Sequence, residues 1–434
     1  MRSILQANSP DILAQLASFE QDTASRETIS QAVRSILSEV REKGDVALME
    51  LTERFDKAQV SPDNLQVKQP ELEDGLASLS NEDIDNIRKA KAQVEFFHRI
   101  TKPDNWAFTN GHGAEVGERF YPIRAVGIYI PGGRVPLVSS VIMSVTLAKL
   151  AGNPRIVVCT PPLPDGSLSA GMRAALCICG VDEVYRVGGA QAIAAMAYGT
   201  QSIPKVDKVF GPGNAYVLEA KRQVFGEVGV DLLPGPSEVA ILTDATCRPS
   251  WTAADLLAQA EHGTGKERIF LLAPSESAIA AIMAEVALQL PALTARERIE
   301  PIMDKRCVCI TYENAQDAIR VINQIAPEHL ELHVAEEAIE SFSSGITTAG
   351  AILQGHHTPT VLGDFTAGPS HTLPTGGAGR FLSGLRLTDF LRRTSVVRYK
   401  PEHLEAAAPV VRTFSRLEHL DAHGRSLEIR LTKP

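Results

Sequence analysis

The feature that most constrains the fold is a series of short apolar segments that lead, mostly through glycine, into helix-forming stretches. The first four expected strands span residues 125–130, 156–160, 184–187 and 208–210. Strands that alternate with helices of this length predict parallel β-α-β units. Glycine-rich turns follow three of these strands, at Pro131-Gly-Gly133, Gly188-Gly189 and Gly211-Pro-Gly213. Because ligands of such sheets bind at the carboxyl ends of the strands, the turns mark an expected binding edge.

A second alternating block begins near Glu238, with expected strands at residues 238–242, 268–272, 307–311 and 351–353, and another entered through Pro327-Glu-His329. We therefore predict an α/β protein with two doubly wound, Rossmann-like domains, residues 125–236 and 237–381. Residues 1–124 are expected to form an N-terminal helical segment, partly packed on the second of these domains. Residues 382–434 are too few to fold alone, so this small C-terminal tail domain must dock on its own subunit or on a partner.

The net charge and the composition of the chain limit the binding partners and the cellular compartment that we expect for it. The net charge is -9 over 434 residues, with no basic block, which argues against nucleic acid and anionic membranes as partners. The sequence contains no apolar run of about 18 residues, and its first residues lack an apolar signal core. None of the six cysteines forms a C-x-x-C pair, which favours buried free thiols in a reducing compartment. We expect a cytoplasmic protein.

A single glycine turn does not predict a nucleotide-binding site, but the three turns taken together favour one. No segment matches the G-x-G-x-x-G fingerprint, and Gly211-Pro-Gly213 has the first two glycines without the third. Each turn alone is equally well explained as a tight strand-to-helix connection. Three of them on one edge are typical of a site where phosphate approaches helix N-termini.

Polar residues that can bind a metal or move protons occur at a few positions along the chain. Gln259 and His262 lie three residues apart, on one face at the end of an expected helix that stops at Gly263. Together with Asp364 and His423 they predict an N/O site for zinc or manganese. The alternatives are a solvated helix end for His262 and a turn-forming role for Asp364, which lies in an expected loop at residues 355–379.

Glu328 and His329 would remain free as an acid–base pair, because a histidine beside a carboxylate is suited to proton transfer near neutrality. The alternative is that Pro327-Glu-His329 only connects a helix to a strand.

The chain resembles the histidinol dehydrogenases along nearly its whole length. The resemblance is carried, in order, by Val126-Gly-Ile-Tyr-Ile-Pro-Gly-Gly133, Val187-Gly-Gly-Ala-Gln-Ala192, Val206-Asp-Lys-Val-Phe-Gly-Pro-Gly-Asn214, Pro234-Gly-Pro-Ser-Glu238, Asp255-Leu-Leu-Ala-Gln-Ala-Glu-His262, Pro327-Glu-His-Leu330, Gly363-Asp-Phe-Thr-Ala-Gly368 and Glu418-His-Leu-Asp-Ala-His423. It implies oxidation of L-histidinol to L-histidine by way of an aldehyde in two NAD-dependent steps. It also implies one zinc per active site and a homodimer whose active site is shared between subunits, the tail crossing to the partner.

The resemblance also implies roles for individual residues. The implied catalytic pair is Glu328 and His329. The implied zinc ligands are Gln259, His262, Asp364 and His423. The implied substrate contacts are Ser237, His329 and Glu418 together with the zinc ligands, and the implied NAD contacts are Tyr129, Gln191 and Asn214.

Three positions depart from the usual family pattern: Thr360 for a glutamate, Phe365 for a tyrosine and Ser370 for an asparagine. These changes bear on the order of the loop and on the rate more than on the reaction. The nearest alternative function is an NAD- and zinc-dependent dehydrogenase of another amino alcohol or polyol. A zinc hydrolase would leave the glycine turns without a role, and a catalytically silent scaffold would not need Glu328 and His329.

Overall fold

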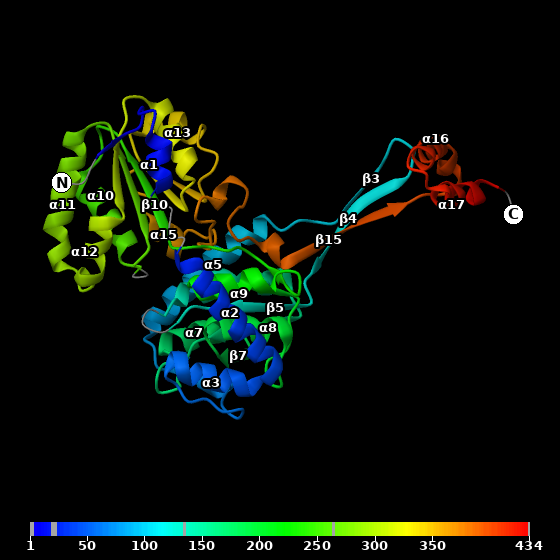
Figure 1. Cartoon of the computed structure of the whole chain (residues 1–434), viewed down its shortest axis with the longest axis horizontal. Coiled ribbons are helices and arrows are strands. Elements are labelled where there is room, and N and C mark those ends of the chain that lie inside the picture. Colours follow the sequence, from blue (N-terminus) through cyan, green and yellow to red (C-terminus); the bar gives the residue numbers. More distant parts are fainter. Residues whose placement is uncertain (1–3, 19–23, 133–135, 263–264, 433–434) are drawn as a thin grey trace.

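The computed structural model describes residues 4–18, 24–132, 136–262 and 265–432, so that Gly133 and Gly263 lie outside the described residues. Two six-stranded sheets dominate it (Figure 1). The first sheet has the order β2 (Gln66–Val67), β7 (Glu183–Arg186), β6 (Arg155–Thr160), β5 (Ala125–Tyr129), β8 (Lys208–Phe210) and β9 (Gly229–Val230). The second has the order β1 (Leu5–Gln6), β12 (Cys307–Thr311), β11 (Arg268–Ala273), β10 (Glu238–Thr243), β13 (His329–His333) and β14 (Ala351–Gln354). All neighbours pair in parallel except β2 with β7, which confirms an α/β protein with parallel sheets.

Helices bury both faces of the first sheet. Successive strand residues point to opposite faces, so Val157 and Val158 of β6 enter two separate apolar cores. One core includes residues of α2 (Ala24–Lys43), α3 (Asp45–Asp56), α8 (Gly189–Tyr198) and α9 (Ala215–Val224). The other includes residues of α4 (Gln69–Ala77), α5 (Asn81–Ile100), α6 (Val138–Ala151), α7 (Ala170–Cys179) and η4 (Leu387–Phe390). The helices of residues 24–100 therefore pack on the first sheet.

The second sheet is covered in the same way. Val239 and Ala240 of β10 enter opposite cores. One core includes α1 (Ile12–Ser18), α13 (Ala315–Ile325), η2 (Glu336–Ala338) and α14 (Ile339–Ser343), and the other includes α10 (Pro249–Ala260), α11 (Glu276–Gln289), η1 (Leu290–Ala292) and α12 (Arg296–Lys305). Because β1 pairs with β12 and α1 contacts α13, the first described residues belong to this sheet.

A third, antiparallel sheet forms an arm that extends away from the two large sheets (Figure 1). Its strands are β3 (Trp106–Thr109), β4 (Glu115–Pro122) and β15 (Leu391–Arg398), and its far end carries α16 (Pro401–Leu417) and α17 (Asp421–Leu431). Phe108, Val397 and Leu417 are each at least 60% exposed on it. No helix among the described residues is long and apolar enough to cross a membrane.

A buried ion pair holds the turn between β8 and α9. Lys221 and Asp231 form an ion pair, and both side chains are almost fully buried. Lys221 Nζ also donates to the Gly211 carbonyl oxygen at 2.9 Å, while Asp231 Oδ2 accepts from the Gly211 N–H at 2.8 Å. Gly211 has a φ of 113°, and a Cβ there would lie 2.0 Å from the Tyr129 carbonyl oxygen, so only glycine fits.

Lys221→Met is expected to lower the free energy of unfolding by about 3–5 kcal/mol, because it leaves the Asp231 carboxylate buried without its cation. Denaturant unfolding of the purified variant measures this loss. Lys205→Met is the matched control, since its partner Glu227 is well exposed and the loss should be much smaller. Equal losses in the two variants would contradict the assignment.

Candidate active site

The strand β13 carries the centre of the site on one face. His329, Glu331 and His333 alternate with Leu330 and Leu332, and all five residues are buried. The two leucines belong to the core that contains α1 and α13, so the three polar side chains face the opposite side, toward α10. In the register, Val239 lies beside His329 and Ile241 beside Glu331. The sheet therefore forces three ionisable groups into a buried row.

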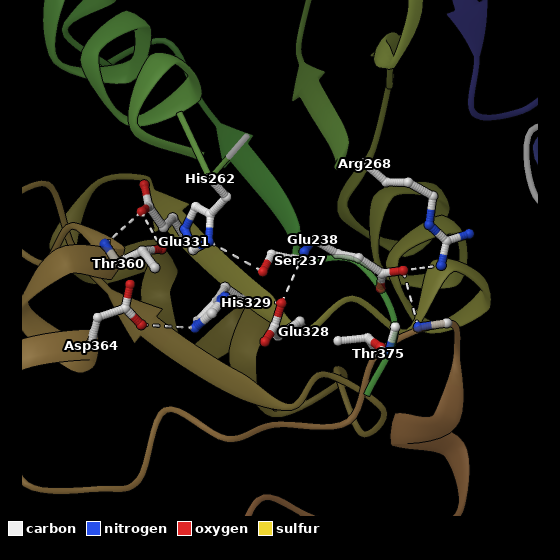
Figure 2. A network of polar contacts seen from close by, with 12 residues as sticks. Ser237, Glu238, His262, Arg268, Glu328, His329, Glu331, Thr360, Asp364 and Thr375 are labelled. Atoms are coloured by element: carbon white, nitrogen blue, oxygen red, sulfur yellow. Dashed lines mark hydrogen bonds and ion pairs between the residues drawn. The ribbon is translucent and has the colours of Figure 1, made fainter. Parts of the chain in front are cut away.

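Glu328 and Asp364 flank His329 (Figure 2). Glu328 precedes β13, and its Oε2 accepts from the Glu238 N–H at 2.9 Å and lies 3.8 Å from His329 Nδ1. Asp364 lies on α15 (Thr360–Phe365), with Oδ1 3.4 Å from His329 Nε2. The expectation of a loop is wrong at this segment, because the residues that follow Pro359, Thr360–Phe365, form a short helix.

The carboxylates and the imidazole change each other's pKa. Burial raises the pKa of Glu328 to about 8, against a smaller opposing effect of His329. Burial alone would lower the pKa of His329, but Glu328 and the bonded Asp364 raise it above its usual value. Burial likewise opposes ionisation of Asp364, yet the hydrogen bond from His329 and the charges of His329, His371 and His262 lower its pKa. His329 is thus an imidazole that can take up and hold a proton.

Gln259 and His262 lie at, and just after, the C-terminal end of α10 (Pro249–Ala260). Gln259 is in the last turn of α10, only 3% exposed, and its Nε2 has no hydrogen-bond partner. His262 follows the helix in a turn, and its Nδ1 lies 3.3 Å from Ser237 Oγ (Figure 2). Burial lowers the pKa of His262, which favours the neutral imidazole that binds metals.

These side chains fit a zinc ion. A neutral imidazole and the carboxylate of Asp364 are ligand types that zinc accepts. The amide of Gln259 is buried and its Nε2 has no hydrogen-bond partner, so the amide can turn over and present its oxygen, the ligand atom, to a metal. His371 supports the carboxylate side, with Nδ1 3.2 Å from the Asp364 backbone oxygen and Nε2 3.2 Å from Ser140 Oγ. Because zinc usually has four ligands, three ligands from one chain leave one coordination position to be filled.

The two predicted site residues of the tail, Glu418 and His423, lie apart from this group. Glu418 and His423 are exposed, at the end of the arm in Figure 1, and no hydrogen bond or ion pair connects them to His262, His329 or Asp364. A single chain therefore does not bring the tail residues to the rest of the site.

The predicted NAD contacts gather at the carboxyl ends of the first sheet. Tyr129 ends β5, and its hydroxyl oxygen accepts from the Gly189 N–H at 3.3 Å. Gln191, in the first turn of α8, is 1% exposed, and its Nε2 has no partner. Asn214 caps α9, because its Oδ1 accepts from the N–H groups of Tyr216 and Val217. Two helix N-termini thus meet at the edge expected for a phosphate-bearing ligand.

The three departures from the family pattern have distinct surroundings. Thr360 donates from its backbone N–H and its hydroxyl to Glu331 Oε1, at 2.7 and 2.6 Å. Phe365 is 57% exposed. Ser370 is buried, and its hydroxyl accepts from the Thr372 N–H at 3.3 Å. Only Thr360 joins the buried row on β13.

Sequence reasoning missed one cluster of ionisable residues. Asp255, Glu331 and His333 place one ligand-type atom each within 4.8 Å of one another. The signal was available, because His329, Glu331 and His333 alternate with leucines, which is the pattern of a strand with one polar buried face. Asp255 joins them from α10, a contact with no sequence signature.

Parallel sheets with glycine turns at the carboxyl ends of one of them, a buried acid–base pair and side chains of metal-ligand type are the features of an α/β enzyme. The chain belongs to the histidinol dehydrogenase family: the model of that family, described as histidinol dehydrogenase, matches residues 19–431. The family catalyses the final steps of histidine biosynthesis with NAD and zinc, and this chain is an NAD-dependent oxidoreductase of that family.

The sequences of known relatives match this chain over nearly its full length. The chain is 43% identical over 403 residues to a histidinol dehydrogenase of Geobacillus kaustophilus, covering 93% of this chain and 94% of the relative. It is 41% identical over 430 residues to one of Rhodopseudomonas palustris, covering 98% of each. The crystal structure of histidinol dehydrogenase from Elizabethkingia anophelis matches with a TM-score of 0.88 at 33% identity, over 92% of each chain.

Proposed function

We propose that this chain oxidises L-histidinol to L-histidine through histidinal, in two successive steps that each reduce one NAD. The observation that carries the proposal is the burial of His329 between Glu328 and Asp364. A histidine so placed is suited to moving protons near neutrality. His329 takes the proton of the alcohol as hydride leaves for NAD, and it serves again in the second oxidation.

Glu328 is assigned the hydration of the aldehyde between the two oxidations. Its carboxylate accepts a proton from the water that adds to the aldehyde carbon, and the hydrated aldehyde is then oxidised to the carboxylate. The raised pKa of Glu328, about 8, makes it a stronger base than an exposed glutamate. Its hydrogen bond from the Glu238 N–H holds one oxygen in place.

The proposed zinc ligands are Gln259, His262 and Asp364 of one chain and His423 of the partner subunit, with one zinc per active site. The buried amide of Gln259, whose oxygen is the ligand atom, and the charge effects of His262 and His329 on the Asp364 carboxylate support this set. A zinc ion bound by these residues would supply a fixed positive charge that orients the substrate for hydride transfer.

The remaining contacts follow from the same arrangement. Substrate is proposed to touch the zinc ligands, His329, Ser237 beside His262, and Glu418 of the partner subunit. NAD is proposed to lie against Tyr129, Gln191 and Asn214, which is supported by the free amide of Gln191 and by the two helix N-termini. The two binding areas belong to the two large sheets.

The domain division that we propose has two doubly wound, Rossmann-like domains at 125–236 and 237–381. The expectation of a helical segment at 1–124, partly packed on the second domain, needs correction: residues 24–100 pack on the first sheet, β3 and β4 belong to the arm, and only the first described residues pack on the second sheet. The small tail domain at 382–434 docks on the partner of a homodimer. Support comes from the exposed apolar side chains of Phe108, Val397 and Leu417 on the arm. The six free cysteines support a cytoplasmic location.

Purified protein is expected to form about two NADH per L-histidinol, because one substrate passes through both oxidations. Chelation should abolish NADH formation and added zinc should restore it, while His262→Ala should need much more zinc for the same rate. Absorbance of NADH measures all three. No NADH from folded, zinc-loaded protein would point to another amino alcohol or polyol as substrate, and activity that survives chelation would remove zinc from the proposal.

A further inference from the structure

The short helix α15 contacts the strand β13 through two polar pairs (Figure 2). At the start of the helix, Thr360 donates from its backbone N–H and its hydroxyl to Glu331 Oε1, at 2.7 and 2.6 Å. One turn later, Asp364 Oδ1 lies 3.4 Å from His329 Nε2. Asp364 and His329 belong to the proposed active site, whereas Thr360 and Glu331 have no role in it so far.

The spacing of the two pairs matches on the helix and on the strand. Residues four apart on a helix share a face and are separated along its axis by roughly 6 Å. Residues two apart on a parallel strand also share a face and are separated by roughly 6.6 Å. The contact of Thr360 with Glu331 and that of Asp364 with His329 therefore form together, and the position of one pair constrains the other.

The helix α15 receives its N-terminal cap from β13. Pro359 precedes the helix and makes no side-chain capping bond. The helix has only six residues, and so short a helix is not stable without contacts to the rest of the protein. The buried carboxylate of Glu331 accepts the first N–H of the helix, at the end where negative charge is favourable.

Glu331 is itself held in place by buried groups. Its Oε2 lies 3.0 Å from His333 Nε2, and His333 Nδ1 lies 2.8 Å from Thr252 Oγ1 on α10. Side-chain exposure is 1% for both Glu331 and His333. The polar chain therefore connects α15 through β13 to α10, which are the elements that carry Asp364 and Gln259 and the strand between them.

We propose that Thr360 and Glu331 are positioning residues, which hold α15 on β13 and thereby place the Asp364 carboxylate for zinc. The inference rests on the proposed function for the role of Asp364 as a ligand. Partners that orient a metal ligand contribute to metal affinity without contacting the metal.

Thr360→Val is expected to raise the zinc dissociation constant of the full-length protein by about 10-fold, because the variant lacks the hydroxyl that donates to Glu331. Thr360→Ala should weaken zinc binding in the same way, and Thr360→Ser, which restores the hydroxyl, should bind zinc as wild type does. Thr358→Val is the matched control, because Thr358 Oγ1 donates to the Gln354 carbonyl oxygen instead. Titration of zinc-free protein with Zn²⁺ against a competing chelator measures the constants.

A second measurement detects the anchoring of α15 without zinc. Hydrogen–deuterium exchange of zinc-free protein should be about 10-fold faster in Thr360→Val than in wild type, in peptides that contain α15, because a hydrogen bond to a buried carboxylate is lost. Exchange in Thr360→Ser and Thr358→Val should match wild type.

The positioning role would be overturned by wild-type zinc affinity in both Thr360→Val and Thr360→Ala, by failure of Thr360→Ser to restore it, or by an equal loss in Thr358→Val. Asp364→Ala separates this proposal from the proposed function. If zinc binding is weakened in Asp364→Ala but not in Thr360→Val, the ligand assignment stands and the positioning role fails. Unchanged zinc binding in Asp364→Ala would remove Asp364 from the zinc site and overturn both.

Discussion

His329→Gln is expected to reduce kcat for NADH formation from L-histidinol by about 10²–10⁴-fold, the usual contribution of a general base. The imidazole is the group that sits within reach of both Glu328 and Asp364, and glutamine cannot accept the proton released by the alcohol. Steady-state kinetics with L-histidinol and with histidinal measure the two oxidations separately. Both should slow, since His329 serves in each, and unfolding curves check that the variant is folded.

Glu328→Gln is the matched variant for this experiment, because Glu328 is assigned only to aldehyde hydration. Oxidation of histidinal should fall sharply in this variant, while the first oxidation should be affected much less. The pKa of Glu328 is raised to about 8, so the carboxylate is protonated below that pH and ionised above it. The wild-type rate with histidinal should therefore increase as pH rises through about 8, and the increase should be absent in Glu328→Gln. Equal losses in both oxidations would contradict the division of roles.

A heterodimer that combines a His329→Gln chain with a His423→Ala chain is expected to retain about half of the wild-type activity, although each homodimer is nearly inactive. The physical reason is that His423 and Glu418 are exposed and belong to the segment with α16 and α17 at the far end of the arm, away from the sheet in which β13 pairs with β10 (Figure 1). If the tail completes the partner's site, one of the two sites in the heterodimer has all of its residues intact. Two affinity tags allow purification of the heterodimer, and NADH formation measures its activity.

The control for this experiment combines His423→Ala with Glu418→Ala. Both changes lie in the tail, so each site of that heterodimer receives a defective tail and activity should stay low. Recovery in the control, or no recovery when His329→Gln is combined with His423→Ala, would show that the site is not shared in this way. Comparing the two heterodimers distinguishes a tail that supplies residues to the partner's site from a general effect of dimer assembly on activity.

The parallel sheets were predictable because their signals are local. A buried strand such as residues 125–129 is a short apolar run, and a glycine turn such as Gly188-Gly189 marks its end within a few residues. Cap residues are local as well: Ser80 begins α5 by accepting from the Asp83 N–H at 3.1 Å. The arm was missed because β4 and β15 pair across more than two hundred residues of sequence, and neither has a buried face to leave an alternating pattern.

The same distinction between local and long-range signals applies to the candidate active site. The sequence by itself determined which residue types are present, the strand and helix that carry His329 and Gln259, and, through the family motifs, the reaction to expect. Only the tertiary structure decided that Asp364 lies on a short helix against His329, that Asp255 meets Glu331 and His333, and that the tail stays away from its own active site. Local patterns reflect backbone geometry over a few residues, whereas these contacts depend on how β13, α10, α15 and the arm pack across long separations in the chain.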